Sequence, residues 1–349
     1  MREIKYQQAI SEAHVQTMEK DSSVFIFGVG VNDPTGIFGT TLEAGKRFGP
    51  SRVIDTPLSE NTLTGIGVGA AICGMRPVLV HARNDFLLLT MDQIVNHAAK
   101  WRYMSGGILS VPLLIRAIVG RGWGQAAQHS QSLQALFAHI PGLNVIMPST
   151  AYDAKGLIAG ALINDRTTIC IEHRWLYEKM GPVPEELYTI PFGKGRIVRK
   201  GSDVTILAIS HMVLESVDAA TECAKDNIDV EIIDPRTLRP LDEDIILESV
   251  KKTGRLIIAD TAWRTCGISA EIAALAAEKC FNSLKAPVIR IGLPETPTPC
   301  SSVLENAYYP SVNTIVEAAK SLVKGNANFK DDIETHRQQS KDKQFSGPF

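Results

Sequence analysis

The chain has 349 residues, of which 44% are hydrophobic and 21% charged, and its formal net charge at pH 7 is −2. This length predicts two domains, and so small a net charge gives no electrostatic case for nucleic acid or an anionic membrane as a partner. No apolar run approaches the ~20 residues that a bilayer span needs. The N-terminal residues have neither a signal-peptide core nor transit-peptide composition, and the six cysteines are scattered without a Cys-x-x-Cys pair. We therefore expect a cytoplasmic protein with free thiols.

The first half of the chain alternates between helical and strand patterns. Helices are predicted over 3–20, near 40–48, from Glu60 to about Cys73, over 90–104 and over 151–163. Buried strands are predicted over 22–31, 53–54, 77–82, 112–118, 144–147 and 167–172. This alternation predicts a parallel sheet that is covered by helices on both faces.

The composition changes after Trp175. Residues 178–202 hold three prolines and four glycines with little periodicity, so we expect a linker there. Beyond it the alternation restarts, with strands at 204–209, 230–233, 256–259 and 287–291 and helices at 212–225, 242–250, 268–280 and 311–323. We divide the chain into a first domain (1–177), a linker (178–202), a smaller α/β domain (203–324) and a polar tail (325–349) that we expect to be disordered.

The most informative stretch is Asp55–Glu60 (DTPLSE), which follows a short strand and delivers one carboxylate to the start of a helix. That helix contains the small-residue run Gly65–Ala71, whose bare backbone can approach a neighbour closely. A carboxylate beside such a dry contact is expected to have a raised pKa. The alternative is that Ser59 or Glu60 only caps the helix.

Three glycine-containing runs come close to phosphate-binding motifs. Gly39–Arg47 has one spacer too many for a P-loop, Gly28–Asp33 ends in the wrong residue, and Gly65–Ala70 has no strand leading into it. We therefore favour helix packing through small residues over nucleotide binding. The glycine-rich run Gly120–Gln131 is more specific, because it presents His129 at the start of a predicted helix; the alternative is a mobile surface loop whose histidine caps that helix.

Several further motifs accompany these stretches over residues 4 to 323. They are Met91–Lys100 (MDQIVNHAAK), Met104–Gly107 (MSGG), Ala127–Gln131 (AQHSQ), Asp153–Gly156 (DAKG), Gly201–Thr205 (GSDVT), Ile233–Leu241 (IDPRTLRPL) and Glu295–Pro299 (ETPTP). In combination the chain resembles the β subunits of thiamine-diphosphate-dependent 2-oxo acid dehydrogenases and, more distantly, the middle and C-terminal domains of transketolase. The resemblance implies an α/β fold with a transketolase-like pyrimidine-binding domain and a smaller C-terminal domain.

The resemblance also implies roles for five side chains. The carboxyl of Glu60 would hydrogen-bond a ring nitrogen of the aminopyrimidine of thiamine diphosphate and promote ionisation of the cofactor, which needs a shared proton near neutral pH. Phe86 would stack on the pyrimidine, and Leu58 and Ala82 would line the same ring. His129 would move protons or hold the substrate carboxylate and the incoming lipoyl group.

One part of the family pattern is missing. The Gly-Asp-Gly…Asn signature for Mg²⁺ and the diphosphate does not occur in this chain. The resemblance therefore implies that an α subunit supplies that half of the site, in an α2β2 assembly with Gly65–Ala71 at an interface, and that a lipoyl acyltransferase is a further partner. Some relatives hold a potassium ion with backbone carbonyls. The matching positions here are Leu113, Ala161, Asn164 and Arg166.

Two segments depart from the pattern, His81–Asp85 (HARND) and Glu172–Trp175 (EHRW). Arg83 and Arg174 beside the thiamine site indicate a 2-oxo acid that is larger or more polar than pyruvate or a branched-chain acid; the alternative is that they form ion pairs at a subunit interface. A split transketolase-like enzyme or a non-oxidative decarboxylase or carboligase is the second candidate function. A non-catalytic assembly subunit is disfavoured, because Glu60, Phe86 and His129 are all present.

Overall fold

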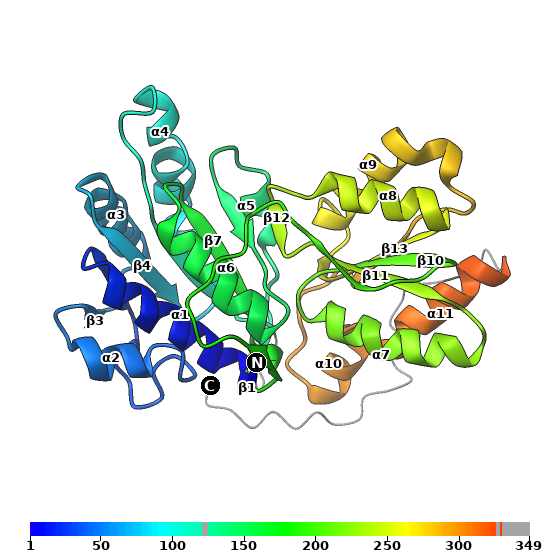
Figure 1. Cartoon of the computed structure of the whole chain (residues 1–349), viewed down its shortest axis with the longest axis horizontal. Helices are drawn as coiled ribbons and strands as arrows, with labels where there is room; N and C mark the ends of the chain where they lie inside the picture. The colour runs from blue at the N-terminus through cyan, green and yellow to red at the C-terminus, as the bar shows by residue number, and fades with distance from the viewer. Residues whose placement is uncertain (121–124, 326–328, 330–349) are drawn as a thin grey trace.

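The computed structural model describes residues 1–120, 125–325 and 329, and these form two α/β units side by side (Figure 1). Within the described residues, the larger sheet has seven strands in the order β12-β6-β7-β5-β4-β2-β3, and the smaller has five in the order β14-β13-β10-β11-β9. A further antiparallel pair, β1 with β8, lies apart from both sheets. The α/β architecture expected from the sequence, a mostly parallel sheet followed by a second, smaller one, is confirmed.

The larger sheet determines where the functional segments meet. Its parallel strands are β2 (Val24–Gly28), β3 (Val53–Asp55), β4 (Arg76–His81), β5 (Leu114–Val119), β6 (Asn144–Ile146) and β7 (Thr168–His173). The register pairs Gly28 with Asp55, and Val119 with His173, so these strands end together. Loops after the carboxyl ends of parallel strands share one edge, where open α/β sheets bind ligands. The segments after β3, β4, β5 and β7 carry all the side chains predicted to be catalytic or to contact cofactor or substrate.

Helices cover both faces of this sheet. On one face, α1 (Tyr6–Lys20) packs against α6 (Ala151–Ile163), with α2 (Leu42–Phe48) beside α1. The other face is covered by α3 (Glu60–Ile72), the 3₁₀ helix η1 (Asn84–Thr90), the π-helix η2 (Gln93–Ala98) and α5 (Gln134–Ala138). The apolar core on this second face continues into the smaller unit through Ile246 and Ile272, so the two units share buried side chains.

The smaller unit is built in the same way. Its sheet joins β9 (Arg196–Arg199), β10 (Val204–Ala208), β11 (Val230–Asp234), β13 (Leu256–Trp263) and β14 (Ile289–Leu293), of which only β9 is antiparallel to its neighbour. The helices are α7 (Met212–Lys225), α8 (Glu243–Thr253), α9 (Ile268–Cys280), α10 (Ser302–Tyr308) and α11 (Val312–Lys324). Two short 3₁₀ turns, η3 (Arg174–Leu176) and η4 (Phe281–Ser283), complete the fold.

The structure corrects three sequence predictions. Residues 3–20 are not one helix, because β1 (Arg2–Lys5) pairs with β8 (Met180–Val183) and the helix begins at Tyr6. The predicted helix 90–104 is not continuous: it contains the last residue of η1, the whole of η2 and the short α4 (Trp101–Met104). The α4 helix protrudes from the larger unit (Figure 1). The π-helical part lies against α3 at Gly65, where the Gln93 side chain fits beside the bare glycine.

The third correction concerns the segment 178–202. It holds two strands: β8 pairs with β1, and β9 pairs with β11. Local periodicity cannot reveal pairing between segments so far apart in the sequence. In addition, β12 (Thr237–Arg239) follows β11 in the chain but pairs with β6 of the larger sheet, so the chain crosses between the units more than once. Most of the tail 325–349 lies outside the described residues, and its predicted disorder with it.

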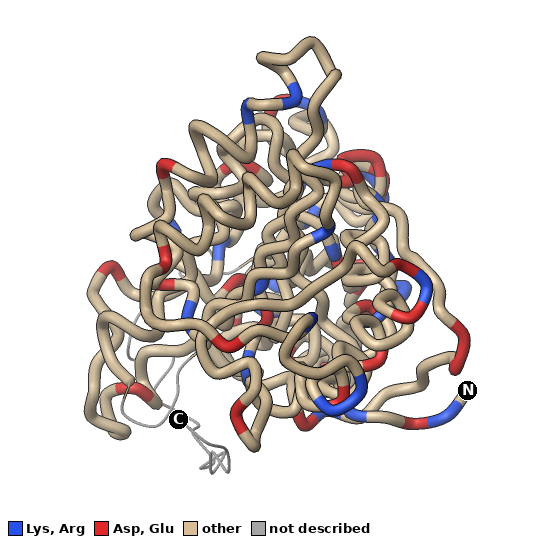
Figure 2. The backbone as a smooth tube through the Cα atoms, turned by 90° about the vertical axis from the view of Figure 1, so that its left-hand side faces the viewer, with Lys and Arg blue, Asp and Glu red and all other residues tan. Residues whose placement is uncertain are grey.

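Acidic and basic residues are interspersed along the described backbone in the view of Figure 2. Among the helices of the described residues, none combines the length and apolar character that crossing a bilayer requires.

Candidate functional site

The corner between β3 and α3 presents Glu60. Its backbone is held by the end of β2, where the Gly30 N–H donates to Asp55 Oδ1 at 2.7 Å and the Thr56 N–H donates to the Gly28 carbonyl at 3.3 Å. Glu60 is the first residue of α3 and is half-buried, and its carboxyl makes no hydrogen bond to the described residues. Leu58 beside it is 76% exposed. The corner therefore offers one carboxyl and one apolar side chain to a ligand or partner.

Small residues let α3 lie close to its neighbours, as the sequence predicted. A Cβ on Gly67 would come within 3.1 Å of Phe27 and 3.2 Å of Leu113, and one on Gly65 within 3.3 Å of the Gln93 side chain. A Cβ on Gly69 would meet nothing within 4 Å, because that side of the helix is open. The close packing is thus within this chain, and the open side is where the expected subunit interface would lie.

The segment after β4 brings two predicted residues together. Ala82 is exposed, and Phe86 is half-buried on η1, which packs against α3 and the ends of β4 and β5. The Phe86 ring meets the His129 ring edge to face, with centroids 5.4 Å apart and planes at 86°. This is a favourable aromatic geometry. Residues 43 positions apart in the chain, both predicted from sequence, therefore line one place.

The loop that carries His129 is tied to the segment after β4. Asp85 Oδ1 accepts hydrogen bonds from the Gln131 backbone N–H at 3.2 Å and from its side-chain amide at 2.8 Å. The Ser130 hydroxyl donates to the Gln125 carbonyl within the loop. The adjacent part of the glycine-rich run, residues 121–124, lies outside the described residues. These bonds hold the half-buried His129 against Phe86.

Arg83 and Arg174 also meet, although they follow different strands. They are 3% and 4% exposed, and both donate to the same oxygen, Oε1 of Gln125, with 3.2 Å for Arg174 Nη1. Burial lowers the pKa of Arg83, and burial together with the neighbouring Arg83 charge lowers the pKa of Arg174 to about 9. The Arg174 guanidinium lies 5.2 Å from the centroid of the Phe38 ring. The sequence predicted Arg83 and Arg174 but gave no signal for Gln125.

Sequence reasoning missed the contacts between the two units. His173, after which Arg174 follows, stacks on His211 at the start of α7, with ring centroids 4.9 Å apart and planes at 23°. Trp175 packs edge to face on both rings. Gly120 makes room for this cluster, because its φ is +98° and a Cβ there would come within 2.7 Å of the His173 ring. Such long-range pairs leave no local pattern in the sequence.

No side-chain metal cluster is found in the part of the chain that the structure describes. The carbonyls that the resemblance assigns to potassium belong to Leu113, Ala161, Asn164 and Arg166. Each of these carbonyls already accepts a hydrogen bond. The Leu113 carbonyl accepts from the Thr168 N–H, and the Arg166 carbonyl accepts from the Thr168 hydroxyl. The Ala161 carbonyl accepts from the Asn164 N–H, and the Asn164 carbonyl accepts from Arg76 at 3.0 Å. A carbonyl oxygen has two lone pairs, so the potassium site stays a prediction.

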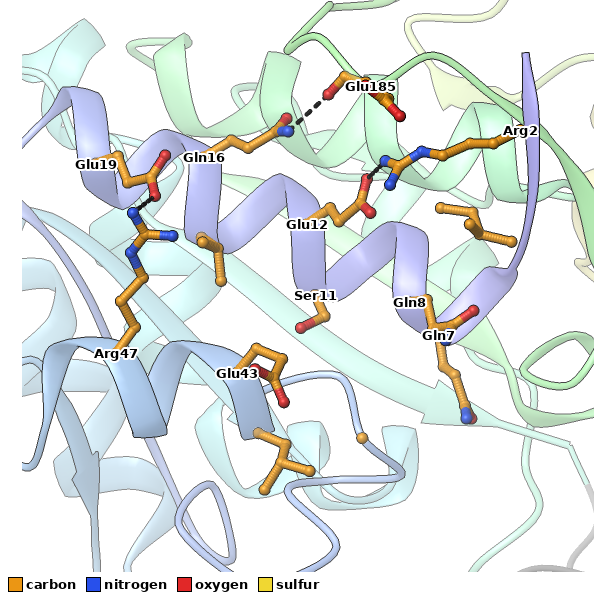
Figure 3. A pocket seen from close by; sticks show the side chains of 14 residues that line it. Arg2, Gln7, Gln8, Ser11, Glu12, Gln16, Glu19, Glu43, Arg47 and Glu185 are labelled. Carbon is orange, nitrogen blue, oxygen red and sulfur yellow. Dashed lines mark hydrogen bonds and ion pairs between the residues drawn. The ribbon is translucent and has the colours of Figure 1, made fainter.

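A separate groove of ≈850 Å³ runs along the outer side of α1 (Figure 3). Ion pairs cross its lining, Arg2 with Glu12 at 2.6 Å and Arg47 with Glu19, while the Gln16 amide donates to the Glu185 carbonyl at 2.7 Å. None of the residues predicted to be functional lines this groove. Its charged side chains are largely paired with one another, so their hydrogen-bonding capacity is mostly used within the chain.

The residues present fit the aminopyrimidine half of thiamine diphosphate. Glu60 offers a carboxyl without a hydrogen-bond partner among the described residues, Phe86 offers an aromatic ring, and Leu58 and Ala82 are exposed. A diphosphate with Mg²⁺ needs oxygen ligands or backbone amides around the ion, and the described residues hold no cluster of carboxylates for it. That a partner supplies the diphosphate half of the site stays a prediction.

Comparisons with known proteins agree with this geometry. Residues 2–179 match the transketolase pyrimidine-binding domain and residues 193–315 the transketolase C-terminal domain. The chain is 45% identical to the acetoin:2,6-dichlorophenolindophenol oxidoreductase subunit beta of Cupriavidus necator (93% of this chain, 98% of the relative). It is 40% identical to the pyruvate dehydrogenase E1 component subunit beta of Rickettsia felis (92% and 98%).

Among solved structures, a split-gene transketolase in an inactive β4 tetramer shares the fold. Its TM-score is 0.73 at 20% identity, and the match covers 92% of this chain and 98% of that one. The two matched domains and the 45% and 40% identical relatives confirm the family expected from the sequence. The chain belongs to the family of two-domain subunits, with transketolase pyrimidine-binding and C-terminal domains, that includes these β subunits.

Proposed function

We propose that this chain is the β subunit of a thiamine-diphosphate-dependent enzyme that decarboxylates a 2-oxo acid and transfers the acyl group to lipoamide. The observation that carries the proposal is the meeting of Phe86 and His129 at the sheet edge where α3 presents Glu60. The relatives named as β subunits support it. Thiamine diphosphate, when bound, supplies the carbon nucleophile that the carbonyl of a 2-oxo acid needs.

This chain's side chains supply positioning and proton transfer. The Glu60 carboxyl would share a proton with a ring nitrogen of the pyrimidine. Phe86 contacts the pyrimidine face, while Leu58 and Ala82 enclose the ring. His129 gives or takes a proton at its imidazole nitrogens beside the reacting group. Its edge-to-face contact with Phe86 keeps the imidazole at that place.

The proposal includes a partner that completes the site. An α subunit binds the diphosphate and Mg²⁺ in an α2β2 assembly, and it covers the open side of α3, where Ile66 is 54% exposed. A lipoyl acyltransferase accepts the acyl group, and the potassium ion binds the four carbonyls named above. We place the enzyme in the cytoplasm. Arg83 and Arg174 contact the substrate.

Binding of the cofactor tests this division of the site. Titration calorimetry with Mg²⁺ should detect tight binding of thiamine diphosphate by the assembly of this chain with its α subunit, and weak or no binding by the chain alone. Micromolar affinity of the isolated chain would refute the shared site. Turnover of sugar phosphates but of no 2-oxo acid by the assembly would favour the second candidate, a split transketolase-like enzyme, whose fold this chain shares.

A further inference from the structure

Two buried arginines converge on a single uncharged oxygen. Arg83 follows β4 and Arg174 follows β7, on either side of β5, and both point to Oε1 of Gln125. Guanidinium groups that converge on one oxygen form the arrangement in which carboxylates are bound. Here a neutral amide oxygen stands at that place, and it satisfies hydrogen bonds without neutralising charge.

Arg83 forms no ion pair in the described part of the chain, and its Nη1 is buried without a hydrogen-bond partner. The negative charge of the nearby Asp85 acts against the effect of burial on the pKa of Arg83, but Asp85 Oδ1 accepts the two Gln131 donors. A buried guanidinium that is held in no ion pair costs free energy, and this cost is offset when an anion binds. Burial and the Arg83 charge both lower the pKa of Arg174, as expected where two guanidinium groups lie close together.

The position of this cluster relative to Phe86 and His129 indicates which anion it receives. Phe86 and His129 are half-buried, whereas the two arginines are almost completely buried and Arg174 packs over the Phe38 ring. The carboxylate that leaves as CO₂ is attached to the reacting carbon and must lie where the chemistry occurs. We therefore assign a group that reaches the more completely buried arginines to the other end of the substrate.

We propose that Arg83 and Arg174 bind a second carboxylate at the far end of a dicarboxylic 2-oxo acid, and that the Gln125 side chain yields its place to that group. This inference rests on the function proposed above and adds the substrate class. Pyruvate and acetoin, which appear in the names of relatives, carry no such second carboxylate.

The test compares substrates of equal chain length that differ in this group. In the assembled enzyme, CO₂ release from 2-oxopentanedioate is measured against 2-oxopentanoate, and from 2-oxohexanedioate against 2-oxohexanoate. We expect kcat/KM to favour the dianion of each pair. Removing one arginine should lower this preference by about 10- to 100-fold, the range typical of a hydrogen bond to a charged group. Arg83→Met and Arg174→Met keep most of the buried apolar volume, and Arg83→Lys keeps the charge if the first variant folds poorly.

Two control variants separate substrate binding from loop positioning. Gln125→Leu removes the shared acceptor and should leave the dianion preference in place, whereas a loop-positioning role predicts that it resembles Arg83→Met. Arg199→Met, which removes an arginine on β9 of the smaller sheet, should not change the preference. The proposal is wrong if wild type prefers the monoanions, or if the arginine variants lower activity on both members of a pair equally.

A direct binding measurement distinguishes failure of this inference from failure of the proposed function. If the assembled enzyme turns over no 2-oxo acid, the proposed function is refuted, but glutarate can still be titrated by calorimetry. Binding that weakens at least tenfold in Arg83→Met would support an anion site in another activity. Absence of binding would overturn the site itself.

Discussion

Two buried arginine sites in the larger unit differ in how their charge is met. Arg116 on β5 donates to both oxygens of Glu172 on β7, at 2.5 and 2.8 Å, and the Tyr177 hydroxyl donates to the same carboxylate at 2.9 Å. The Glu172 charge and hydrogen bonds raise the pKa of Arg116 despite its burial. Arg83 and Arg174, by contrast, share the oxygen of a neutral amide, and burial lowers the pKa of both.

The contrast distinguishes polar groups that hold the fold from those available to a ligand. The Arg116–Glu172 pair lies within the sheet, and its two charges are matched, so its charges need no partner from outside the chain, although Arg116 Nη1 is buried without a hydrogen-bond acceptor among the described residues. The Arg83 cluster and Glu60 lie after the ends of strands, where the described residues leave charge or hydrogen-bonding capacity unused. Buried groups with a perturbed pKa, such as Arg83 and Arg174, concentrate at functional sites.

The largest expected effect is at Glu60. Glu60→Gln keeps the size of the side chain, so folding and assembly should be preserved, but the amide cannot pass a proton as a carboxyl does. Loss of one positioned acid–base group costs ~10²–10⁴-fold in rate. The measurements are decarboxylation by the assembled enzyme and hydrogen–deuterium exchange at the thiazolium carbon of bound cofactor, which should slow together.

A matched control for this variant is Glu43→Gln, because Glu43 also lies in the first turn of a helix, α2. A first-turn acid that only caps or complements the helix dipole contributes about 1 kcal/mol or less to stability, and its loss leaves turnover unchanged. Equal exchange rates in wild type and Glu60→Gln would assign Glu60 to this second group and remove it from the mechanism.

The next effect tests the matched pair. Glu172→Gln leaves the Arg116 charge buried without a counter-charge, and breaking a buried pair in this way costs about 3–5 kcal/mol of unfolding free energy. Urea unfolding of the chain measures the loss. The double variant Arg116→Met/Glu172→Met removes both charges and should recover most of the stability, because an apolar pair of similar volume needs no counter-charge.

The same measurement on Arg83→Met should give the opposite pattern. That substitution removes a cation without an ion-pair partner among the described residues, so we expect it to cost less than ~1 kcal/mol, or to stabilise the chain. A loss as large as that of Glu172→Gln would show that Arg83 holds the fold, and the contrast between the two arginine sites would then disappear.

The parts of the molecule that could be predicted are those that leave local patterns. Spacing predicted the alternation of helices and strands, the buried strands β4 and β5, and the close packing of α3 through Gly65 and Gly67. The family resemblance, which rests partly on the motif around Glu60 and the run that carries His129, implied that both belong to one site, and the structure places Phe86 against His129. Contact of these residues with a cofactor stays a prediction.

The parts that could not be predicted depend on contacts between distant segments. The three residues of β12 carry too little pattern to reveal that they pair with β6 rather than with the smaller sheet. Gln125 is an ordinary polar residue in the sequence, and only the convergence of Arg83 and Arg174 gives it a role. The stack of His173 on His211 likewise joins two units whose relative position no local spacing reports.

A further expected effect concerns a third buried charge, Asp260, at the contact between the units. Gln134 on α5 donates from Nε2 to both of its carboxylate oxygens, at 2.8 and 2.9 Å, while Gln134 Oε1 is buried without a partner. Burial raises the pKa of Asp260 to about 7. When protonated, the carboxyl carries a hydrogen-bond donor, which the buried Gln134 Oε1 lacks. Asp260 is therefore intermediate between the two arginine sites: its match depends on pH.

The sign of the effect follows from the two pKa values. Asp260 keeps its proton in the folded state up to about pH 7, whereas in the unfolded chain it ionises near its ordinary value of 3.8. The folded state therefore binds more protons in this window, and its stability falls as pH rises. From pH 5 to pH 7 the linkage amounts to about 2 kcal/mol. Asp260→Asn keeps a donor for Gln134 Oε1 and cannot ionise. Urea unfolding at both pH values should therefore show wild type losing that much stability relative to the variant. The contributions of the other titrating groups cancel in this difference, because both proteins contain them. Equal pH dependence in the two proteins would mean that Asp260 stays ionised in the fold and that Gln134 alone compensates its charge.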